Sequence, residues 1–399
     1  MKRILILAFV LILIAAGTAV FAQSAELEAW TLAFNNANSV AEQLIYIRNV
    51  VDGNLQGADT FYAMALTRLV TEMPNVTGQT NLDAADNMAA ILTFQLGEYE
   101  HEESAANILH VATYFENPLV RTEALIALGK IGYEIGLPHV IQTLNDLNTQ
   151  PQSNIDMRER AERLAFGAIS SLEHYAAPEG YLPVYFASTG WYSERIRSHA
   201  STALVNIMSD PTEPLLEIVE NTGYSYDVKY LALQTSENSQ SSDSNKARVA
   251  VAALAEGWRQ QGSNNHQRQI LTQMRMLALN MIRRYRTQDE AVYPQLNRSY
   301  LNGATDERLA VLYALEALAS EESVRLLSDY LNTIHQRRTS NTLTPVDEQL
   351  VRVIIPALGN TGSTNRSAAR PILTLVQHSP EWTNMVRNLA RDSLERIGN

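Results

Sequence analysis

The sequence predicts an all-α protein, built as a right-handed α-solenoid of stacked antiparallel helix pairs. One register occurs four times: an arginine, a small or apolar residue three positions later, a small residue at six and leucine at seven. The four copies begin at Arg121, Arg197, Arg308 and Arg387. They are separated by 76, 111 and 79 residues, which correspond to two, three and two units of about 37 to 40 residues, near the period of two-helix repeats.

The clearest unit covers residues 117–147, and each part of it has a local cause. Asn117 is a favourable N-cap, and Pro118 suits the first helical turn, where its missing N–H costs nothing. Apolar residues at helical spacing then predict a helix up to Ile131, which Gly132 ends. A second amphipathic helix is predicted from Leu137 to Leu147. Each helix has an apolar stripe that only a neighbouring helix can cover.

The segment Val120 to Gly132 resembles the first helix of HEAT-like repeats, specifically the short variety found in phycobiliprotein lyases. Val386 to Gly398 repeats it closely. The resemblance extends over roughly residues 105–399. The resemblance implies a stack of helix pairs and a protein that acts by binding through an extended surface, but it does not imply lyase chemistry.

The chain begins with the pattern of an export signal. Lys2 and Arg3 precede an apolar run from Ile4 to Ala16, and small residues follow at the positions that a signal peptidase inspects. The run is shorter than the roughly 20 residues that span a bilayer, so cleavage is favoured over an uncleaved anchor. We therefore expect a signal peptide at residues 1–22, a periplasmic or secreted product, and no stable membrane insertion after cleavage.

The rest of the chain divides into two predicted regions. Residues 23–104 are helical but off-period, with breaks near Asp52-Gly53 and Met73-Pro74, and are predicted to form an atypical N-terminal cap. Residues 105–399 are predicted to form the solenoid. Polar stretches near 235–246, 260–267 and 339–344 predict flexible loops within it.

Composition limits the choice of partner. The chain has no cysteine, which excludes disulfides, thiolate metal sites and a cysteine nucleophile. Its formal net charge is −12, and loss of Lys2 and Arg3 with the signal would make it −14. Such a protein is a poor nucleic-acid binder, because phosphate contacts need a cationic surface. Cationic or neutral partners fit better, although solubility alone also explains the acidity.

Three groups of residues are candidates for a role. The repeat arginines Arg121, Arg197, Arg308 and Arg387 are expected to form a structural ladder of ion pairs between repeats. An aromatic cluster is the first candidate contact surface, although core packing explains it as well; its members are Tyr175, Tyr181, Tyr185, Trp191 and Tyr192. A basic helix over about 265–288 is the second, with a solvated helix face as the alternative; its candidate residues are Arg275, Arg283 and Arg284.

The sequence offers no catalytic, cofactor-binding or metal-ligating candidates. The eight histidines are at least nine residues apart, so no local zinc pair exists, and nucleophile-elbow and Walker motifs are absent. The leading hypothesis is a non-catalytic exported scaffold, without a cofactor, that binds another protein or an extended peptide. Two alternatives stay open: an all-helical toroid that binds or degrades polysaccharide, and a structural envelope component.

Overall fold

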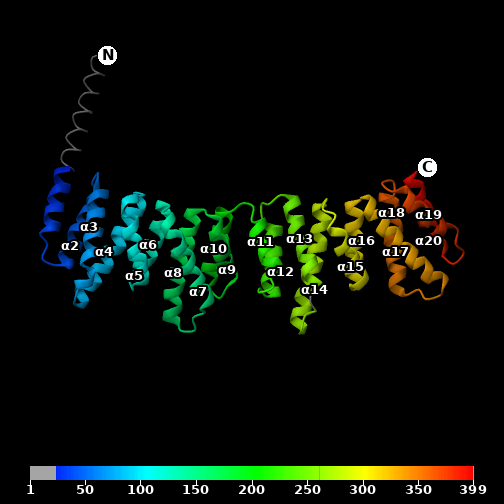
Figure 1. Ribbon diagram of the computed structural model, residues 1–399, viewed down its shortest axis with the longest axis horizontal. Coiled ribbons are helices and arrows are strands. Elements are labelled where there is room, and N and C mark those ends of the chain that lie inside the picture. The colour runs from blue at the N-terminus through cyan, green and yellow to red at the C-terminus, as the bar shows by residue number, and fades with distance from the viewer. Residues whose placement is uncertain (1–23, 260, 399) are drawn as a thin grey trace, which may run out of the picture. The chain divides into compact units, whose positions relative to one another are not determined.

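The computed structural model describes residues 24–259 and 261–398, and within these ranges the chain forms helices, turns and loops but no strand (Figure 1). The predicted all-α class is confirmed. The predicted signal peptide at residues 1–22 lies outside the described residues. None of the helices in the described ranges is long and apolar enough to cross a membrane. The chain forms two compact units, unit 1 up to Met208 and unit 2 from Ser209.

Unit 1 begins with a helical segment at residues 24–35. Its further helices are α2 (Val40–Gly53), α3 (Ala58–Glu72), α4 (Gln79–Glu98), α5 (Ala105–Tyr114), α6 (Pro118–Ile131), α7 (Leu137–Thr149), α8 (Ile155–Tyr175), α9 (Tyr181–Thr189) and α10 (Glu194–Ile207). Four short 3-10 turns precede or follow them: Met73–Asn75, Glu102–Ser104, Glu134–Gly136 and Pro178–Gly180.

Unit 2 contains the remaining helices. These are α11 (Thr212–Glu220), α12 (Tyr226–Asn238), α13 (Asp243–Gly257), α14 (Asn265–Tyr285), α15 (Val292–Asn302), α16 (Thr305–Leu318), α17 (Glu321–Thr339), α18 (Pro345–Thr361), α19 (Arg366–His378) and α20 (Asn384–Ile397).

The helices of each unit pack in chain order. The main contacts join helices that are one or two places apart, so even-numbered helices line up with even ones and odd with odd. This is the nearest-neighbour packing of stacked helix pairs. The four arginine registers lie in α6, α10, α16 and α20, which are two, three and two helix pairs apart along the chain, as predicted. The solenoid arrangement and its right-handed sense stay predictions.

The predicted unit at residues 117–147 is confirmed in detail. The side chain of Asn117 accepts a hydrogen bond from the backbone N–H of Leu119 at 2.9 Å, and Pro118 is the first residue of α6. The helix ends at Gly132, whose φ of 72° lies in the left-handed region that glycine adopts without strain. The next helix, α7, buries Val140 and Leu144.

Small residues bring successive even helices close together. A Cβ atom added to any of three glycines would lie within 2.9 Å of a small residue on the next even helix. The pairs are Gly97 with Ala127, Gly129 with Ser171, and Gly359 with Ser393. Ala127 and Ser393 occupy the sixth position of the repeat register, so the structure explains why that position is small.

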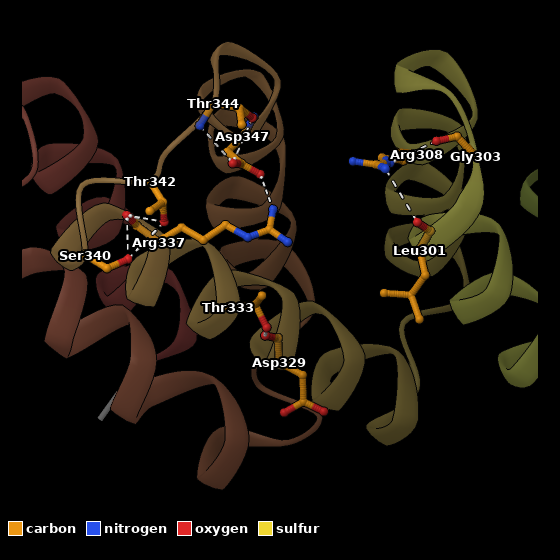
Figure 2. Close-up of polar contacts among 10 residues, drawn as sticks. All are labelled: Leu301, Gly303, Arg308, Asp329, Thr333, Arg337, Ser340, Thr342, Thr344 and Asp347. Carbon is orange, nitrogen blue, oxygen red and sulfur yellow. Dashed lines mark hydrogen bonds and ion pairs between the residues drawn. The ribbon is translucent and has the colours of Figure 1, made fainter.

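The repeat arginines do not form the predicted ladder of ion pairs between repeats. The Nε of Arg121 donates to the carbonyl of Ala112 near the end of α5 at 2.9 Å, and Arg308 donates to the carbonyls of Leu301 and Gly303 at the end of α15 (Figure 2). The last carbonyls of a helix lack intrahelical partners and attract a cation. These two arginines therefore cap the preceding helix.

The other two repeat arginines have partners on their own helix. Arg197 pairs with the exposed Glu194 at 2.7 Å, and Arg387 donates to the side-chain oxygen of Asn384. The predicted partner in a neighbouring repeat is therefore wrong for these two arginines, because a long side chain also reaches one turn back along its own helix.

The predicted breaks in residues 23–104 are confirmed, since α2 ends at Gly53 and a 3-10 turn begins at Met73. The loop predicted at 235–246 is wrong for most of its length, because α12 and α13 leave only residues 239–242 between them. Ser242 caps α13, and Asn264 likewise starts α14 inside the loop predicted at 260–267. The loop predicted at 339–344 is confirmed as residues 340–344; its far end is fixed by Asp347, which forms a capping box with Thr344 (Figure 2).

Unit 2 is expected to lose stability as the pH falls below about 6.5, the ordinary pKa of histidine. The ring of His335 is buried, and its Nδ1 accepts a hydrogen bond from the indole of Trp382 at 3.0 Å. Burial lowers the pKa of His335, so its contribution is complete above the unfolded pKa and is lost as pH falls through the folded pKa. The difference between the melting temperatures at pH 7.5 and pH 5 should be smaller in His335→Gln than in the wild type.

Glutamine can accept the same indole hydrogen bond but does not titrate in this range. Burial also lowers the pKa of His139 and His199 in unit 1, so the pH dependence of the stability of unit 1 should be the same in wild type and variant. An identical pH dependence of wild type and His335→Gln would show that His335 contributes nothing to it.

Candidate functional site

The predicted aromatic contact surface lies mostly in the core of unit 1. Tyr181, Tyr185 and Tyr192 are buried, and burial raises the pKa of Tyr181 and Tyr192. The hydroxyl of Tyr175 donates to the carbonyl of Tyr133 at 2.7 Å. The predicted contact surface is therefore contradicted for these three buried tyrosines, whereas for the half-buried Tyr175 and Trp191 it stays a prediction.

Trp191 completes this cluster at the end of α7. Its indole N–H donates to the carbonyl of Leu147 at 3.1 Å, and its ring stacks on Tyr192 with the centroids 4.3 Å apart. The hydroxyl of Tyr192 donates to the side chain of Asn148 at 3.0 Å. The polar groups of two aromatic residues thus join the connection between α9 and α10 to α7, which is a packing role.

The predicted basic helix is α14, and its arginines differ in environment. Arg275 is nearly buried: it pairs with Glu307 at 2.7 Å, donates to the carbonyl of Gly257 at 2.9 Å, and lies over the ring of Trp258. Its assignment to a partner surface was wrong, because all these partners are within unit 2. Arg283 lies over the ring of Tyr313, with 5.0 Å between guanidinium carbon and ring centroid.

Arg284 is open to solvent. Its side chain is 70% exposed, 3.8 Å from Glu237, and it lines a concavity of about 780 Å³ together with Asp243 and Lys246. Two acidic and two basic side chains meet there, so their formal charges cancel. The basic character predicted from α14 alone is offset by its neighbours.

A different surface of unit 1 combines a hollow, charge and exposed apolar groups. Two adjoining concavities of about 650 and 690 Å³ cross the beginnings of α4, α6 and α8. They share Gln79, Asp86, Glu116 and Asn117 as lining residues, so they form one continuous depression. We call these two concavities the acidic groove.

Carboxylates outnumber cations in the acidic groove. The carboxylates are those of Asp83, Asp86, Glu116, Asp156 and Glu159, and the cations are Arg160 and Arg163. In the described ranges, no lysine or arginine forms an ion pair with any of these five carboxylates; the ion pair at the start of α8 joins Arg158 to Glu162 instead. The negative charge of the groove is therefore not neutralised by direct pairing.

Two of the carboxylates are held by neutral donors. The side-chain amide of Asn117 donates to Asp86 at 2.9 Å, and that of Gln79 donates to Asp83 at 2.8 Å. A neutral amide fixes the direction of a carboxylate but leaves its charge in place. The groove thus presents oriented anionic groups to solvent.

Exposed apolar groups lie beside these charges. Tyr114 is 70% exposed, and its ring lies 4.6 Å from that of His110. Both line the second concavity, while the first includes Leu119, which is 41% exposed. A large exposed aromatic at the edge of a hollow is a typical anchor of a protein interface.

The acidic groove was not predicted from the sequence. Its carboxylates come from α4, from the segment that precedes α6 and from α8, about 30 to 40 residues apart, and each alone resembles an ordinary solvated acid near a helix start. Among the described residues, no group of three or more histidine, aspartate or glutamate side chains is arranged to hold a metal ion. No protein-family model matches the chain, and no curated protein matches it significantly.

Proposed function

We propose that this protein is a non-catalytic scaffold that binds another protein, or an extended peptide from one, through the acidic groove of unit 1. The observation that carries the proposal is the combination of a continuous hollow with the exposed ring of Tyr114 and unpaired carboxylates. Nearest-neighbour packing of helix pairs supports it, because such folds expose long surfaces and usually act by binding. Export to the periplasm or beyond is part of the same proposal.

Site-specific photo-crosslinking tests this function. A photoreactive residue at position 114 of the mature chain should give adducts with a protein of the envelope fraction. The same residue at position 301 is the control, since Leu301 is 61% exposed on unit 2. Adducts from position 114 alone are expected. No adducts, or the same adducts from both positions, would exclude binding through the groove.

The polysaccharide alternative receives no specific support. It required carboxylates and the aromatic residues between Tyr175 and Tyr192 to line one cleft. The acidic groove has carboxylates but none of these aromatic residues among its lining, and Tyr181, Tyr185 and Tyr192 are buried. No structural feature favours the envelope-component alternative either, so neither is proposed as a second function.

A further inference from the structure

The charge of the chain is distributed unevenly between the two units. Residues 24–208 contain 22 acidic and 9 basic side chains, a formal net charge of −13, whereas residues 209–398 contain 21 and 20, a net charge of −1. General solubility does not explain this asymmetry, because acidic residues on either unit would make the protein equally soluble. The field around unit 1 attracts cations and repels anions.

Within this field, the acidic groove has features that suit an extended chain. Its two concavities adjoin, so together they are longer than either one. Carboxylates occur along both, from Asp83 in the second to Asp156 and Glu159 in the first. A segment lying along the groove could therefore meet a carboxylate at several successive side chains.

The apolar contribution comes from Tyr114, whose face can receive an aromatic or aliphatic side chain, or the cation of an arginine or lysine. The buried Phe115 also lines the second concavity. A purely ionic ligand would not contact the exposed ring of Tyr114. A peptide with both basic and apolar side chains would contact the ring as well as the carboxylates.

We infer that the acidic groove binds an extended segment of a partner protein in which lysine or arginine residues flank an aromatic or aliphatic one. The inference rests on the proposed function and specifies its partner. The basic side chains pair with the carboxylates of Asp83, Asp86, Glu116, Asp156 and Glu159. The apolar side chain packs on Tyr114.

The test measures binding of three labelled peptides to the full mature chain by fluorescence anisotropy. The peptides have the same length and the same central tryptophan, and their flanks are lysine and arginine, glutamine, or glutamate. The basic peptide is expected to bind at least tenfold more tightly than the other two at low salt. Its affinity should fall as the salt concentration rises, because salt screens exposed charges.

Two matched triple variants distinguish the contribution of the groove carboxylates to peptide binding from that of the general charge of unit 1. Asp83→Asn/Glu116→Gln/Glu159→Gln removes three exposed carboxylates from the groove, and is expected to weaken the basic peptide about tenfold. The control triple variant neutralises exposed glutamates in three 3-10 turns of unit 1 that do not line the groove, and should weaken it no more than about twofold; its positions are Glu102, Glu134 and Glu179. Both variants change the net charge equally.

Tyr114→Ser tests the apolar contact and should weaken the basic peptide about threefold or more. Circular dichroism of each variant checks that the helices are intact. Equal effects of the two triple variants would overturn the inference, since binding would then reflect overall charge. Full competition by spermine, with no effect of Tyr114→Ser, would also overturn it, because any small polycation would then suffice.

The results also distinguish this inference from the proposed function. If the neutral or acidic peptide binds as tightly as the basic one, and Tyr114→Ser weakens it, the groove is a peptide site but its partner is not cationic. If position 114 crosslinks to a protein while no basic peptide binds, the scaffold function stands and the inference fails. If neither occurs, both are wrong.

Discussion

Replacing Lys229 by alanine is expected to lower the free energy of unfolding of unit 2 by about 3 kcal/mol. Lys229 is 1% exposed, and its ammonium group lies 2.5 Å from the carboxylate of Glu256, which is itself buried. Without Lys229, a carboxylate stays buried with one cation fewer. Arg259 still contacts Glu256 at 3.1 Å, so the loss should lie at the lower end of the range for a broken buried pair.

Urea unfolding followed by circular dichroism measures this effect. Arg248→Ala is the control, because Arg248 forms an ion pair of similar length with Glu213, at 3.0 Å, but both side chains are exposed. Exposed pairs contribute less than about 1 kcal/mol. If the two variants unfold at the same urea concentration, burial does not determine the strength of the Lys229 pair. Adding Glu256→Leu to Lys229→Ala should restore part of the stability, since no buried carboxylate is then left.

Replacing Gly129 by alanine is expected to destabilise unit 1 by about 3 kcal/mol, the upper part of the usual range for overpacking. A Cβ at this position would lie 2.5 Å from the backbone oxygen and 2.6 Å from the Cα of Ser171 on α8. Those are backbone atoms of a buried helix, so no side chain can rotate away. Helix propensity alone predicts the opposite sign, because alanine is favoured over glycine by about 1 kcal/mol inside a helix.

The sign of the change therefore decides between the two effects. Gly53→Ala at the end of α2 is the matched control, since the new Cβ would meet only side-chain atoms of Leu55, at 3.3 Å, and no backbone atom. That variant should be neutral or slightly stabilising. Thermal unfolding of both variants measures the two changes in stability and therefore their signs. A stabilised Gly129→Ala protein would mean that α6 and α8 are not as close as described here.

Much of the helical framework could be predicted because its causes are local. The N-cap at Asn117, the stop at Gly132 and the break at Gly53 depend on residues only a few positions away. The loop predicted at 235–246 was wrong for the same kind of reason: its polar residues were taken as loop formers, although serine and aspartate also start helices. Ser242 does so for α13.

The roles of the candidate binding residues could not be predicted, because they depend on partners that are far away along the chain. Arg275 was correctly recognised as part of a basic helix, but Glu307 lies 32 residues away and its pairing could not be read from α14. The aromatic stretch from Tyr175 to Tyr192 has the same composition whether it faces solvent or the core. Composition gives the number of aromatic rings, whereas packing decides which of them water can reach.

The sequence by itself determined the all-α class and the number of helix pairs between successive arginine registers. It did so because helix periodicity, caps and small-residue spacing act over one or two turns. Only the tertiary structure decided that Arg121 and Arg308 cap helix ends, that Lys229 is buried, and that carboxylates from α4, from the segment before α6 and from α8 line one groove. The physical reason is distance: burial and electrostatic fields are set by neighbours in space, which in stacked helix pairs lie some 30 to 40 residues away along the chain.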